Sequence, residues 1–400
     1  MTQLSHGSRM KIMTAMYTLR RGGAYDRFLM MLEAFLERDC EIHCLSLSPI
    51  QIKHSLFHNH VMYFPFMKVN GLIPRLVVLS IFPPWAIWVG WRNQVDLIIA
   101  FGSLYAFIQS FAKWLLRKTM VTLIRGRSSF GLKIHNSSKW VLSLNKLIEN
   151  MGFHFSDRVI TNNAAIQKEI LKDFRGRNID VQVLYNNIPA MNIREPEDVL
   201  QTRDKYRIPG SAKVLMTAGI LNPGKNIETL IECVSKIDVK NVYVLIVGEG
   251  SREADFRYRD SLQGLAKNLG VEKQVIFTGW LEKEDLWKIY LASDLFVLPS
   301  LSEGMPNALL EALGLNLACM GSWIPGIQDI LQYEELMFDP EDGGAIADKV
   351  SRFLSDEQHA NHILQLCHER RRHFVFDWKE KVFQMVTQRP FHGGKACQSR

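Results

Sequence analysis

Short apolar runs alternate with longer segments of helical periodicity along the first half of the chain. The first apolar run, KIMTAMY, precedes two glycines, Gly22 and Gly23, and a helical pattern that ends at Leu36. Further helices are predicted over residues 105–116, 139–152 and 164–173, together with a long helical stretch that ends at Arg92. The strands predicted in this half are residues 11–17, 41–48, 61–66, 95–102, 120–126, 157–163 and 180–187.

The alternation restarts after a polar linker at residues 188–202. The strands predicted beyond it are residues 213–220, 242–250, 274–280, 295–300 and 317–322. The predicted helices are residues 225–237, 253–269, 283–292, 327–331 and one that begins at Pro306. Two successive series of this kind predict two Rossmann-like, doubly wound parallel sheets.

We therefore expect an N-terminal domain at residues 1–190, a second domain at 205–375 and a C-terminal segment at 376–400. Ligands of doubly wound sheets bind beyond the carboxyl ends of the strands. The cleft between the two domains is the expected site.

The charge is distributed unevenly over these domains. The net charge of the 400 residues is +7, but residues 1–190 hold 23 Lys and Arg against 11 Asp and Glu, whereas the remainder holds 25 against 30. The basic first half indicates an anionic partner, either a membrane surface, a phosphorylated lipid or a nucleic acid. No nucleic-acid-binding motif accompanies the charge, so a nucleic acid is not the expected partner.

The most apolar window, Leu76 to Trp91, bears on membrane contact. It is shorter than the roughly 20 residues that a spanning helix needs, and Pro83 and Pro84 interrupt it. Its three Trp residues suit either an interfacial helix or a helix packed against a sheet. The six cysteines lack metal-ligand spacing and no secretory signal is present, so we expect free thiols and a cytoplasmic, peripherally membrane-bound protein.

The stretch SEGMPNALLE places Glu303 and Glu311 on either side of a predicted helix start at Pro306. The two carboxylates could edge one pocket, where amide groups hold an anion and carboxylates accept hydrogen bonds from sugar hydroxyls. A hydrolytic acid pair is a second interpretation. A third is an acid that complements the helix dipole followed by an exposed helix glutamate.

Other candidates follow the strands of the second domain. Lys225 stands at the predicted mouth of a helix, where a cation is best explained by an anion shared with the helix, although a solvated lysine is the simpler alternative. Gly248, Gly250 and Gly279 end two predicted strands, where backbone could approach a flat ligand or turn tightly.

Together these motifs resemble the retaining glycosyltransferases of family 4, which have the GT-B fold. The resemblance runs from Gly219 through Lys225, VGEG, FTGW, SEGMPNALLEAL and GIQDIL, and Glu303 and Glu311 match the E-x7-E motif of the family. RGGAYDRF, with Gly22 and Gly23, resembles the glycine loop of the first domain. FVFDWKEKVF resembles the helix that closes the fold by crossing back to that domain.

The resemblance implies specific roles, with Glu303, Lys225 and Glu311 as the candidate catalytic residues. Lys225 would bind the donor diphosphate, Glu311 the ribose hydroxyls and Glu303 the donor sugar. The backbone of Gly304, Met305, Pro306 and Asn307 would hold sugar and phosphate, and Gly250, Gly279, Trp280 and Leu281 would border the base. In this family the leaving phosphate is thought to take the acceptor proton, so the configuration is retained without a dedicated base.

Two positions depart from the family pattern. Ile220 stands where the family often has a second phosphate-binding Arg, so Arg20, Arg21, Arg125 or Arg127 would have to help neutralise the phosphate. Arg125 stands where a sugar-lining His is frequent, and it would instead face an acceptor phosphate. No Asp-x-Asp motif follows a strand, so no metal and no cofactor are expected.

The sequence therefore predicts a retaining glycosyltransferase that moves a hexose or N-acetylhexosamine from a nucleotide-sugar, with a UDP-sugar as the expected donor. The expected acceptor is a lipid-linked glycan or polysaccharide of the O-antigen, capsule or exopolysaccharide type. A nucleotide-sugar epimerase, another GT-B enzyme and a non-catalytic nucleic-acid-binding protein are the alternatives. The donor sugar, linkage and acceptor do not follow from the sequence.

Overall fold

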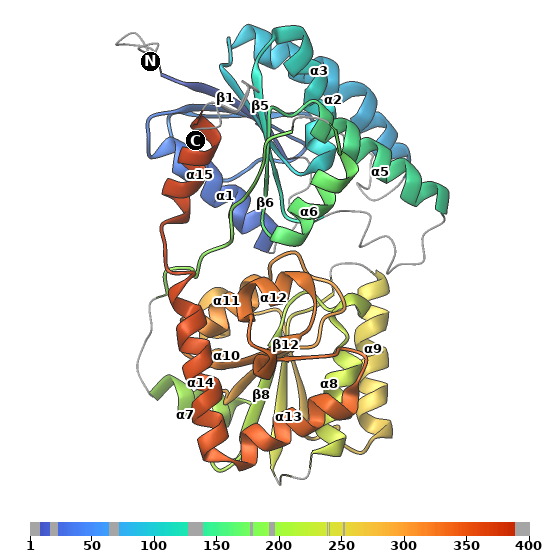
Figure 1. Cartoon of the computed structure of the whole chain (residues 1–400), viewed down its shortest axis with the longest axis vertical. Coiled ribbons are helices and arrows are strands. Elements are labelled where there is room, and N and C mark those ends of the chain that lie inside the picture. The colour runs from blue at the N-terminus through green and yellow to red at the C-terminus, as the bar shows by residue number, and fades with distance from the viewer. Residues whose placement is uncertain are drawn as a thin grey trace, which may run out of the picture. The chain divides into compact units, whose positions relative to one another are not determined.

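The computed structural model describes residues 9–16, 23–63, 72–126, 139–176, 179–191, 197–237, 239, 241–250 and 253–388. The chain forms two compact units (Figure 1). Unit 1 comprises residues 1–184 and 377–400, and unit 2 comprises residues 185–376.

Unit 1 is built on a seven-stranded sheet in the order β3-β2-β1-β4-β5-β6-β7. Every pair of neighbouring strands is parallel. The strands are β1 Lys11–Ala15, β2 Glu41–Ser46, β3 Phe57–Val61, β4 Leu97–Phe101, β5 Thr119–Ile124, β6 Arg158–Thr161 and β7 Val181–Val183. The helices are α1 Gly23–Leu36, α2 Leu72–Arg92, α3 Ser103–Leu116, α5 Lys139–His154, α6 Ala164–Asp173 and α15 Trp378–Thr387.

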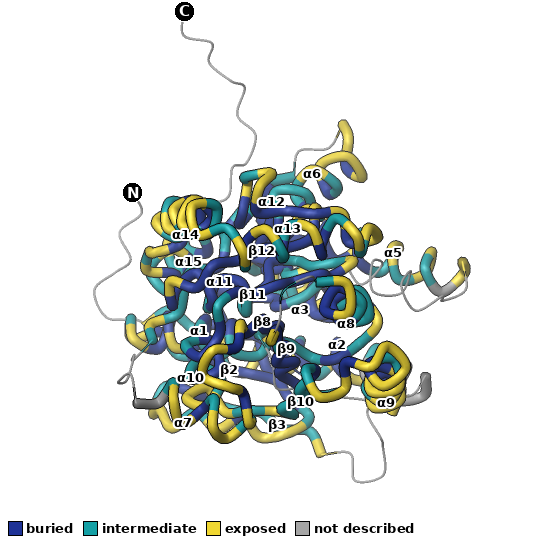
Figure 2. Tube along the Cα trace, turned by 90° about the horizontal axis from the view of Figure 1, so that it is seen from below, coloured by how far each residue is buried: buried dark blue, intermediate teal, exposed yellow. Residues whose placement is uncertain are grey.

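Unit 2 contains a six-stranded parallel sheet in the order β10-β9-β8-β11-β12-β13. The strands are β8 Lys213–Ala218, β9 Val242–Val247, β10 Val275–Gly279, β11 Leu295–Leu298, β12 Ala318–Ser322 and β13 Met337–Phe338. The helices are α7 Glu197–Lys205, α8 Ile227–Lys236, α9 Glu253–Asn268, α10 Lys283–Leu291, α11 Asn307–Gly314, α12 Pro325–Leu331, α13 Gly343–Ser355 and α14 Glu357–Arg372. Figure 2 shows the central strands β8, β11 and β12 in the colour of buried residues. The prediction of two doubly wound parallel sheets is confirmed.

The third predicted strand, residues 61–66, lies partly outside the described residues, because residues 64–66 are not described. The strand that the structure shows at this place, β3, spans Phe57–Val61 and includes the polar residues His58, Asn59 and His60. This strand pairs with β2 alone, at the edge of the sheet. An edge strand keeps one side exposed and so needs no continuous apolar run.

The helix α2 continues through Pro83 and Pro84, which were expected to interrupt it. A proline inside a helix removes one backbone hydrogen bond, so another interaction must hold this segment. Phe82, Ala86 and Val89 follow helical spacing and are fully buried, so packing on this face stabilises the helix. Among the described residues, no helix is long and apolar enough to cross a membrane.

Part of the predicted linker is helical, because α7 begins within it at Glu197. The helix lacks an apolar stripe, since Leu200 is exposed. Its attachment is polar instead: the guanidinium of Arg203 donates to the carbonyl oxygens of Ala292 and Ala212 at 3.2 and 3.0 Å. The helix also packs against α10. Apolar periodicity does not reveal a short helix whose attachment is largely polar.

The C-terminal helix α15 belongs to unit 1, where it packs against α1. The rings of Phe383 and Phe35 lie 5.2 Å apart, and the guanidinium of Arg27 lies over the ring of Trp378 at 5.4 Å. The last described helix therefore packs on the first helix of unit 1.

Candidate functional site

The donor-side candidates of unit 2 follow four adjacent strands. The sheet order β10-β9-β8-β11 places the loops that begin at Gly279, Gly248, Gly219 and Pro299 next to one another. Backbone hydrogen bonds join these loops: Leu221 donates to Glu249 at 3.2 Å, and Leu301 donates to Gly224 at 2.9 Å. The candidates thus share one edge of the sheet, at the carboxyl ends of its strands.

Gly248 permits the closest approach between these loops. It has a φ of +124°, and a Cβ atom there would lie 1.9 Å from the carbonyl oxygen of Gly219. Its N–H donates to the carbonyl of Gly279 at 3.0 Å. A side chain at Gly248 would therefore separate the loops after β8 and β9.

Lys225 was predicted to lie in the first turn of a long helix, and this prediction is wrong. It ends a short 3-10 turn, Pro223–Lys225, and Asn226 then adopts a left-handed conformation with a φ of +52°. The helix α8 starts at Ile227, whose N–H is bound by the hydroxyl of Tyr258 at 3.1 Å. Lys225 therefore belongs to a separate turn that precedes α8.

The ammonium group of Lys225 instead bonds to Glu303. Its Nζ lies 2.6 Å from Glu303 Oε1, and the hydroxyl of Ser300 donates to the same oxygen at 2.8 Å. The side chains of Lys225 and Glu303 are 20% and 13% exposed, so the pair can be reached from solvent. Sequence reasoning gave these two residues separate ligand groups and did not predict their contact or the role of Ser300.

Gly219 supports the position of Lys225. With a φ of +152°, it lies so close that a Cβ atom would be 3.1 Å from Lys225 Cε. This contact gives the glycine a definite function, because any larger residue would push the lysine stem. Ile220, the departure from the family pattern, is half-buried and supplies a carbonyl to the Asn222 side chain at 3.0 Å.

The start of α12 packs directly against the backbone of the loop that carries Glu303. A Cβ atom at Gly326 would lie 2.2 Å from the carbonyl oxygen of Gly304 and 2.7 Å from that of Glu303. Gly326 belongs to the GIQDIL run, which the resemblance included without giving it a role. Its function is to let the start of α12 touch the loop backbone.

The helix α11 begins one residue later than predicted, at Asn307, with Pro306 as its N-cap in an extended conformation. Asn186, a buried residue not identified from the sequence, fixes this helix start. Its side-chain amide donates to the carbonyl of Met305 at 3.1 Å and to the side-chain oxygen of Asn307 at 2.9 Å. The Met305 side chain is buried, so its contribution to a ligand site would come from its backbone.

Glu311 is half-buried on α11 and has a neighbour that the sequence did not predict. The hydroxyl of Tyr290 lies 3.3 Å from Glu311 Oε2 and 3.1 Å from the carbonyl oxygen of Ala308. Burial, followed by the charge of Glu311, raises the pKa of Tyr290 well above its ordinary value. Tyr290 therefore remains a neutral donor that orients this carboxylate.

The residues predicted to border a base lie after β9 and β10. Gly279 has a φ of +73°, and Trp280 is exposed while Leu281 is half-buried. At Gly250 a Cβ atom would lie 2.7 Å from the Cβ of Asp255. Gly250 thus permits close packing against the first turn of α9, and Trp280 offers an exposed ring.

The acceptor-side candidates belong to unit 1. Gly23 is the first residue of α1, and Arg125 is half-buried just after β5. Burial and the positive charge of Arg27, opposed by the charge of Asp26, place the pKa of Arg125 at about 9. Gly22, Arg20, Arg21 and Arg127 lie outside the described residues.

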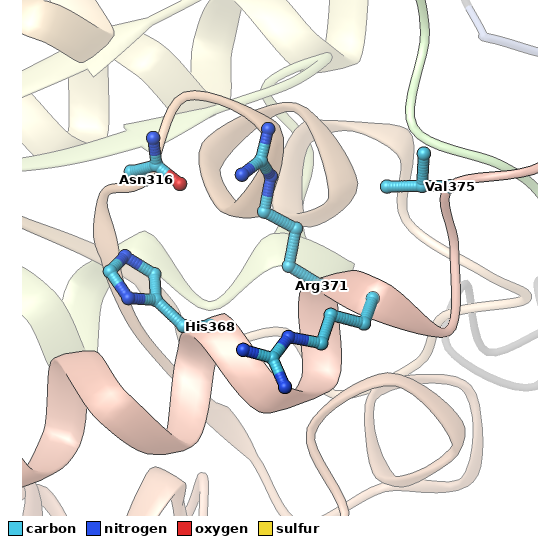
Figure 3. A pocket seen from close by; sticks show the side chains of 5 residues that line it. Asn316, His368, Arg371 and Val375 are labelled. Carbon is cyan, nitrogen blue, oxygen red and sulfur yellow. The ribbon is translucent and has the colours of Figure 1, made fainter.

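A pocket of about 310 Å³ in unit 2 does not coincide with these candidates. Figure 3 shows Asn316, His368, Arg371 and Val375 around it. Its basic residues lie in the last turns of α14, where cations complement the helix dipole. Their position is thus explained without a ligand.

The described residues contain no group of three or more His, Cys, Asp and Glu side chains that could hold a metal ion. Five cysteines are buried free thiols, as expected, and Cys397 lies outside the described residues.

The segment that carries the donor-side candidates matches the model of a known protein family. Residues 198–365 match the family Glycosyl transferases group 1. The matched segment lies within unit 2 and includes every donor-side candidate from Gly219 to Glu311. Gly22, Gly23 and Arg125 lie outside it.

The chain is similar to curated proteins, two of which are named glycosyltransferases. The chain is 28% identical over 215 residues to the uncharacterized glycosyltransferase MJ1607 of Methanocaldococcus jannaschii, which covers 52% of this chain and 54% of that protein. It is 30% identical over 219 residues to the lipopolysaccharide core biosynthesis glycosyltransferase LpsE of Rhizobium meliloti. This match covers 54% of this chain and 59% of LpsE. N-acetyl-alpha-D-glucosaminyl L-malate synthase of Bacillus anthracis is 28% identical over 277 residues, 68% of each protein. The chain thus spans little more than half the length of the first two relatives.

A solved structure matches nearly the whole chain. Anabaena Alr3699/HepE, solved in complex with UDP and glucose, has a TM-score of 0.75 and 17% sequence identity, and the match covers 95% of this chain and all of that one. At this identity the likeness concerns the fold alone. The predicted GT-B fold, with its two parallel-sheet α/β domains, is confirmed.

Proposed function

We propose that the protein is a retaining glycosyltransferase that moves a hexose or N-acetylhexosamine from a UDP-sugar. The observation that carries this proposal is the hydrogen-bonded set of Lys225, Glu303 and Ser300 at the carboxyl ends of the strands, within the segment that matches the glycosyltransferase family. A partly exposed ammonium suits a diphosphate, and a carboxylate suits sugar hydroxyls. The UDP and glucose bound by the Anabaena protein favour this donor class.

In the proposed donor complex, the ammonium of Lys225 binds the diphosphate while Glu303 contacts the sugar. An ammonium has three donors, so Lys225 can bond to a phosphate oxygen without losing Glu303. Glu311, oriented by Tyr290, would accept hydrogen bonds from the ribose hydroxyls. The exposed ring of Trp280 would border the base together with Gly250, Gly279 and Leu281.

The proposed reaction needs no dedicated base. The bond between the anomeric carbon and the diphosphate oxygen breaks, and its electron pair leaves with UDP. The acceptor hydroxyl oxygen bonds to the same face of the sugar, and its proton passes to the leaving phosphate oxygen. Lys225 would stabilise the charge that develops on that phosphate. We propose that this step requires no metal, so EDTA should leave the rate unchanged.

The proposed acceptor is a lipid-linked glycan or polysaccharide of the cell surface, reached from the cytoplasmic face of the membrane. The lipopolysaccharide core function named for LpsE favours this class. The L-malate in the name of the Bacillus anthracis relative makes a small hydroxy acid the alternative acceptor class.

A panel of UDP-, GDP- and ADP-sugars tests the donor assignment. One UDP-sugar should raise the thermal unfolding temperature and be hydrolysed slowly to UDP and free sugar in the absence of acceptor. The Glu303→Ala and Glu311→Ala variants should each weaken that response, whereas Lys236→Ala, at the far end of α8, should not. A nucleotide-sugar that is epimerised and not cleaved would overturn the transferase assignment.

Arg125 provides a test of the acceptor side. If its guanidinium binds an acceptor phosphate, Arg125→Ala should raise the acceptor KM about tenfold or more, since a charge-assisted hydrogen bond contributes about 1.5–3 kcal/mol. The donor KM should be unchanged, and a denaturation curve of the variant checks that it is folded. An unchanged acceptor KM would exclude this role for Arg125.

A further inference from the structure

Three adjacent helices of unit 1 expose large apolar side chains. The helix α3 contacts both α2 and α5, and Figure 1 shows the three together on one side of the unit. We call their exposed residues the aromatic helix surface, which consists of Ile81, Trp88 and Trp91 on α2, Phe111, Trp114 and Leu115 on α3, and Trp140, Leu144, Leu147 and Met151 on α5.

The spacing of these residues shows that they form faces of their helices. On α5, for example, Trp140, Leu144, Leu147 and Met151 recur every three or four positions, so they project from one side. The opposite side of α5 packs closely on α3, where a Cβ atom at Gly152 would lie 2.8 Å from the carbonyl oxygen of Ser103. The apolar stripe therefore faces outward in the folded unit.

The exposure of the tryptophans is large. Trp91, Trp114 and Trp140 are 68%, 72% and 67% exposed. In unit 2, the exposed large apolar residues are scattered over separate elements, for example Phe256 on α9 and Trp323 after β12. Scattered apolar residues are normal on a protein surface, whereas a contiguous set marks an interaction site.

All exposed charged residues on these three helices are basic. The single acidic residue of α2, α3 and α5 is Glu149, which is buried and accepts a hydrogen bond from Ser103. Lys113 and Lys146 form ion pairs with Asp157 and Asp173.

Arg92, Lys118 and Lys139 form no ion pair with another described residue. They lie at the end of α2, just after α3 and at the start of α5. The aromatic helix surface thus combines apolar residues with cations whose charge is not balanced by an acid on the same helices.

We propose that the aromatic helix surface docks on an anionic phospholipid bilayer. Tryptophan side chains favour the boundary between headgroups and acyl chains, and basic side chains are attracted to anionic headgroups. In a symmetric dimer the aromatic helix surface would meet the same surface of a second copy, and the helices offer no exposed acid to pair with Arg92, Lys118 and Lys139. The charge complementarity therefore favours lipid over a copy of the same chain.

This proposal extends the proposed function, because a lipid-linked acceptor would be reached at the same membrane. The two can fail separately. Vesicle binding is measured without sugar transfer, and donor hydrolysis is measured without vesicles.

Flotation of the full-length chain with phosphatidylcholine vesicles, with and without phosphatidylglycerol, tests the surface. The wild type should bind the anionic vesicles more strongly. A triple variant, Trp91→Ser, Trp114→Ser and Trp140→Ser, should bind the vesicles at least about tenfold more weakly, because the loss of each ring removes a large apolar contact with the bilayer. A matched double variant in unit 2, Phe256→Ser and Trp323→Ser, should bind as the wild type does.

A second triple variant, Arg92→Gln, Lys118→Gln and Lys139→Gln, separates charge from apolar contact. Its affinity for anionic vesicles should fall about fivefold for each residue replaced, whereas its affinity for neutral vesicles should change little. Wild-type flotation by the tryptophan variant would overturn the proposal. So would a wild-type dimer in sedimentation that the tryptophan substitutions dissociate, since the surface would then bind a second copy.

Discussion

Two ion pairs, one in each unit, differ in how completely their cations are bonded. In unit 1, Arg158 bonds to Asp180 at 2.7 Å and also to the carbonyl oxygens of Met385 and Gln388 at the end of α15. Arg158 and Asp180 are only 2% and 12% exposed. In unit 2, Lys225 bonds to Glu303, and no further acceptor for its ammonium occurs among the described residues.

This difference is the basis on which we propose a structural role for the first pair and a ligand-binding role for the second. A buried guanidinium with several acceptors ties α15 to β6 and leaves little capacity for a ligand. A partly exposed ammonium with unused donors can still bond to a ligand. Lys225 also lies beyond the carboxyl ends of the strands, where ligands of parallel sheets bind. The first pair should therefore govern stability and the second should govern donor binding.

The largest expected effect is on the first pair. Arg158→Ala would leave Asp180 without its main partner and release the carbonyls of α15, so the free energy of unfolding should fall by about 3–5 kcal/mol. Chemical denaturation measures this change. The double variant Arg158→Ala with Asp180→Ala should recover part of it, because no buried carboxylate is then unpaired. Equal stability of wild type and Arg158→Ala would show that the pair is not structural.

The second pair should respond in activity. Lys225→Ala should lower kcat/KM about 10²–10³-fold, the range found when one donor to a developing negative charge is removed. The free energy of unfolding should change by only about 1 kcal/mol, because the pair is partly exposed. Steady-state kinetics of donor hydrolysis and a denaturation curve give both values. A variant with wild-type kinetics but lost stability would make the two ion pairs alike.

The pattern of apolar runs and the order of motifs were sufficient to predict the two sheets, and they led to Lys225 and Glu303. These residues follow strands, and parallel strands bring their carboxyl ends together wherever the chain crosses over. The edge strand β3 and the helix α7 were missed because neither depends on an apolar stripe.

The supporting contacts of the candidate site could not be predicted in the same way. Asn186 and Asn307 are 121 positions apart, and the hydroxyl of Tyr290 reaches a carboxylate on the next helix. Nothing local distinguishes such an Asn or Tyr from others in the chain. The short turn before α8 was also missed, since it depends on the left-handed conformation of Asn226.

A smaller effect should follow from a change in the support of the Glu303 loop. In Gly326→Ala the new Cβ would overlap the carbonyl oxygen of Gly304, and overpacking of this kind costs about 1–3 kcal/mol. Because the loop must shift, donor binding should weaken as well. Gly264→Ala is the matched control. It lies exposed in α9 with no atom within 4 Å of a new Cβ and should stabilise the protein by about 0.5–1 kcal/mol. Unaltered donor binding by Gly326→Ala would mean that α12 does not position Glu303.

The smallest effect should come from Tyr290→Phe, which sharpens the assignment of Glu311. The substitution removes one hydroxyl that is shared between Glu311 and the carbonyl of Ala308, so the free energy of unfolding should fall by about 1 kcal/mol. Glu311 would keep its charge but lose an orienting donor. If it binds the ribose, the donor KM should rise a few-fold while kcat stays nearly constant, because the ribose is remote from the bond that breaks. Tyr243→Phe, a half-buried tyrosine of β9, is the control for loss of a hydroxyl elsewhere in unit 2. A fall in kcat with an unchanged KM would instead connect Glu311 with the reacting sugar, and the roles proposed for the two glutamates would have to be exchanged.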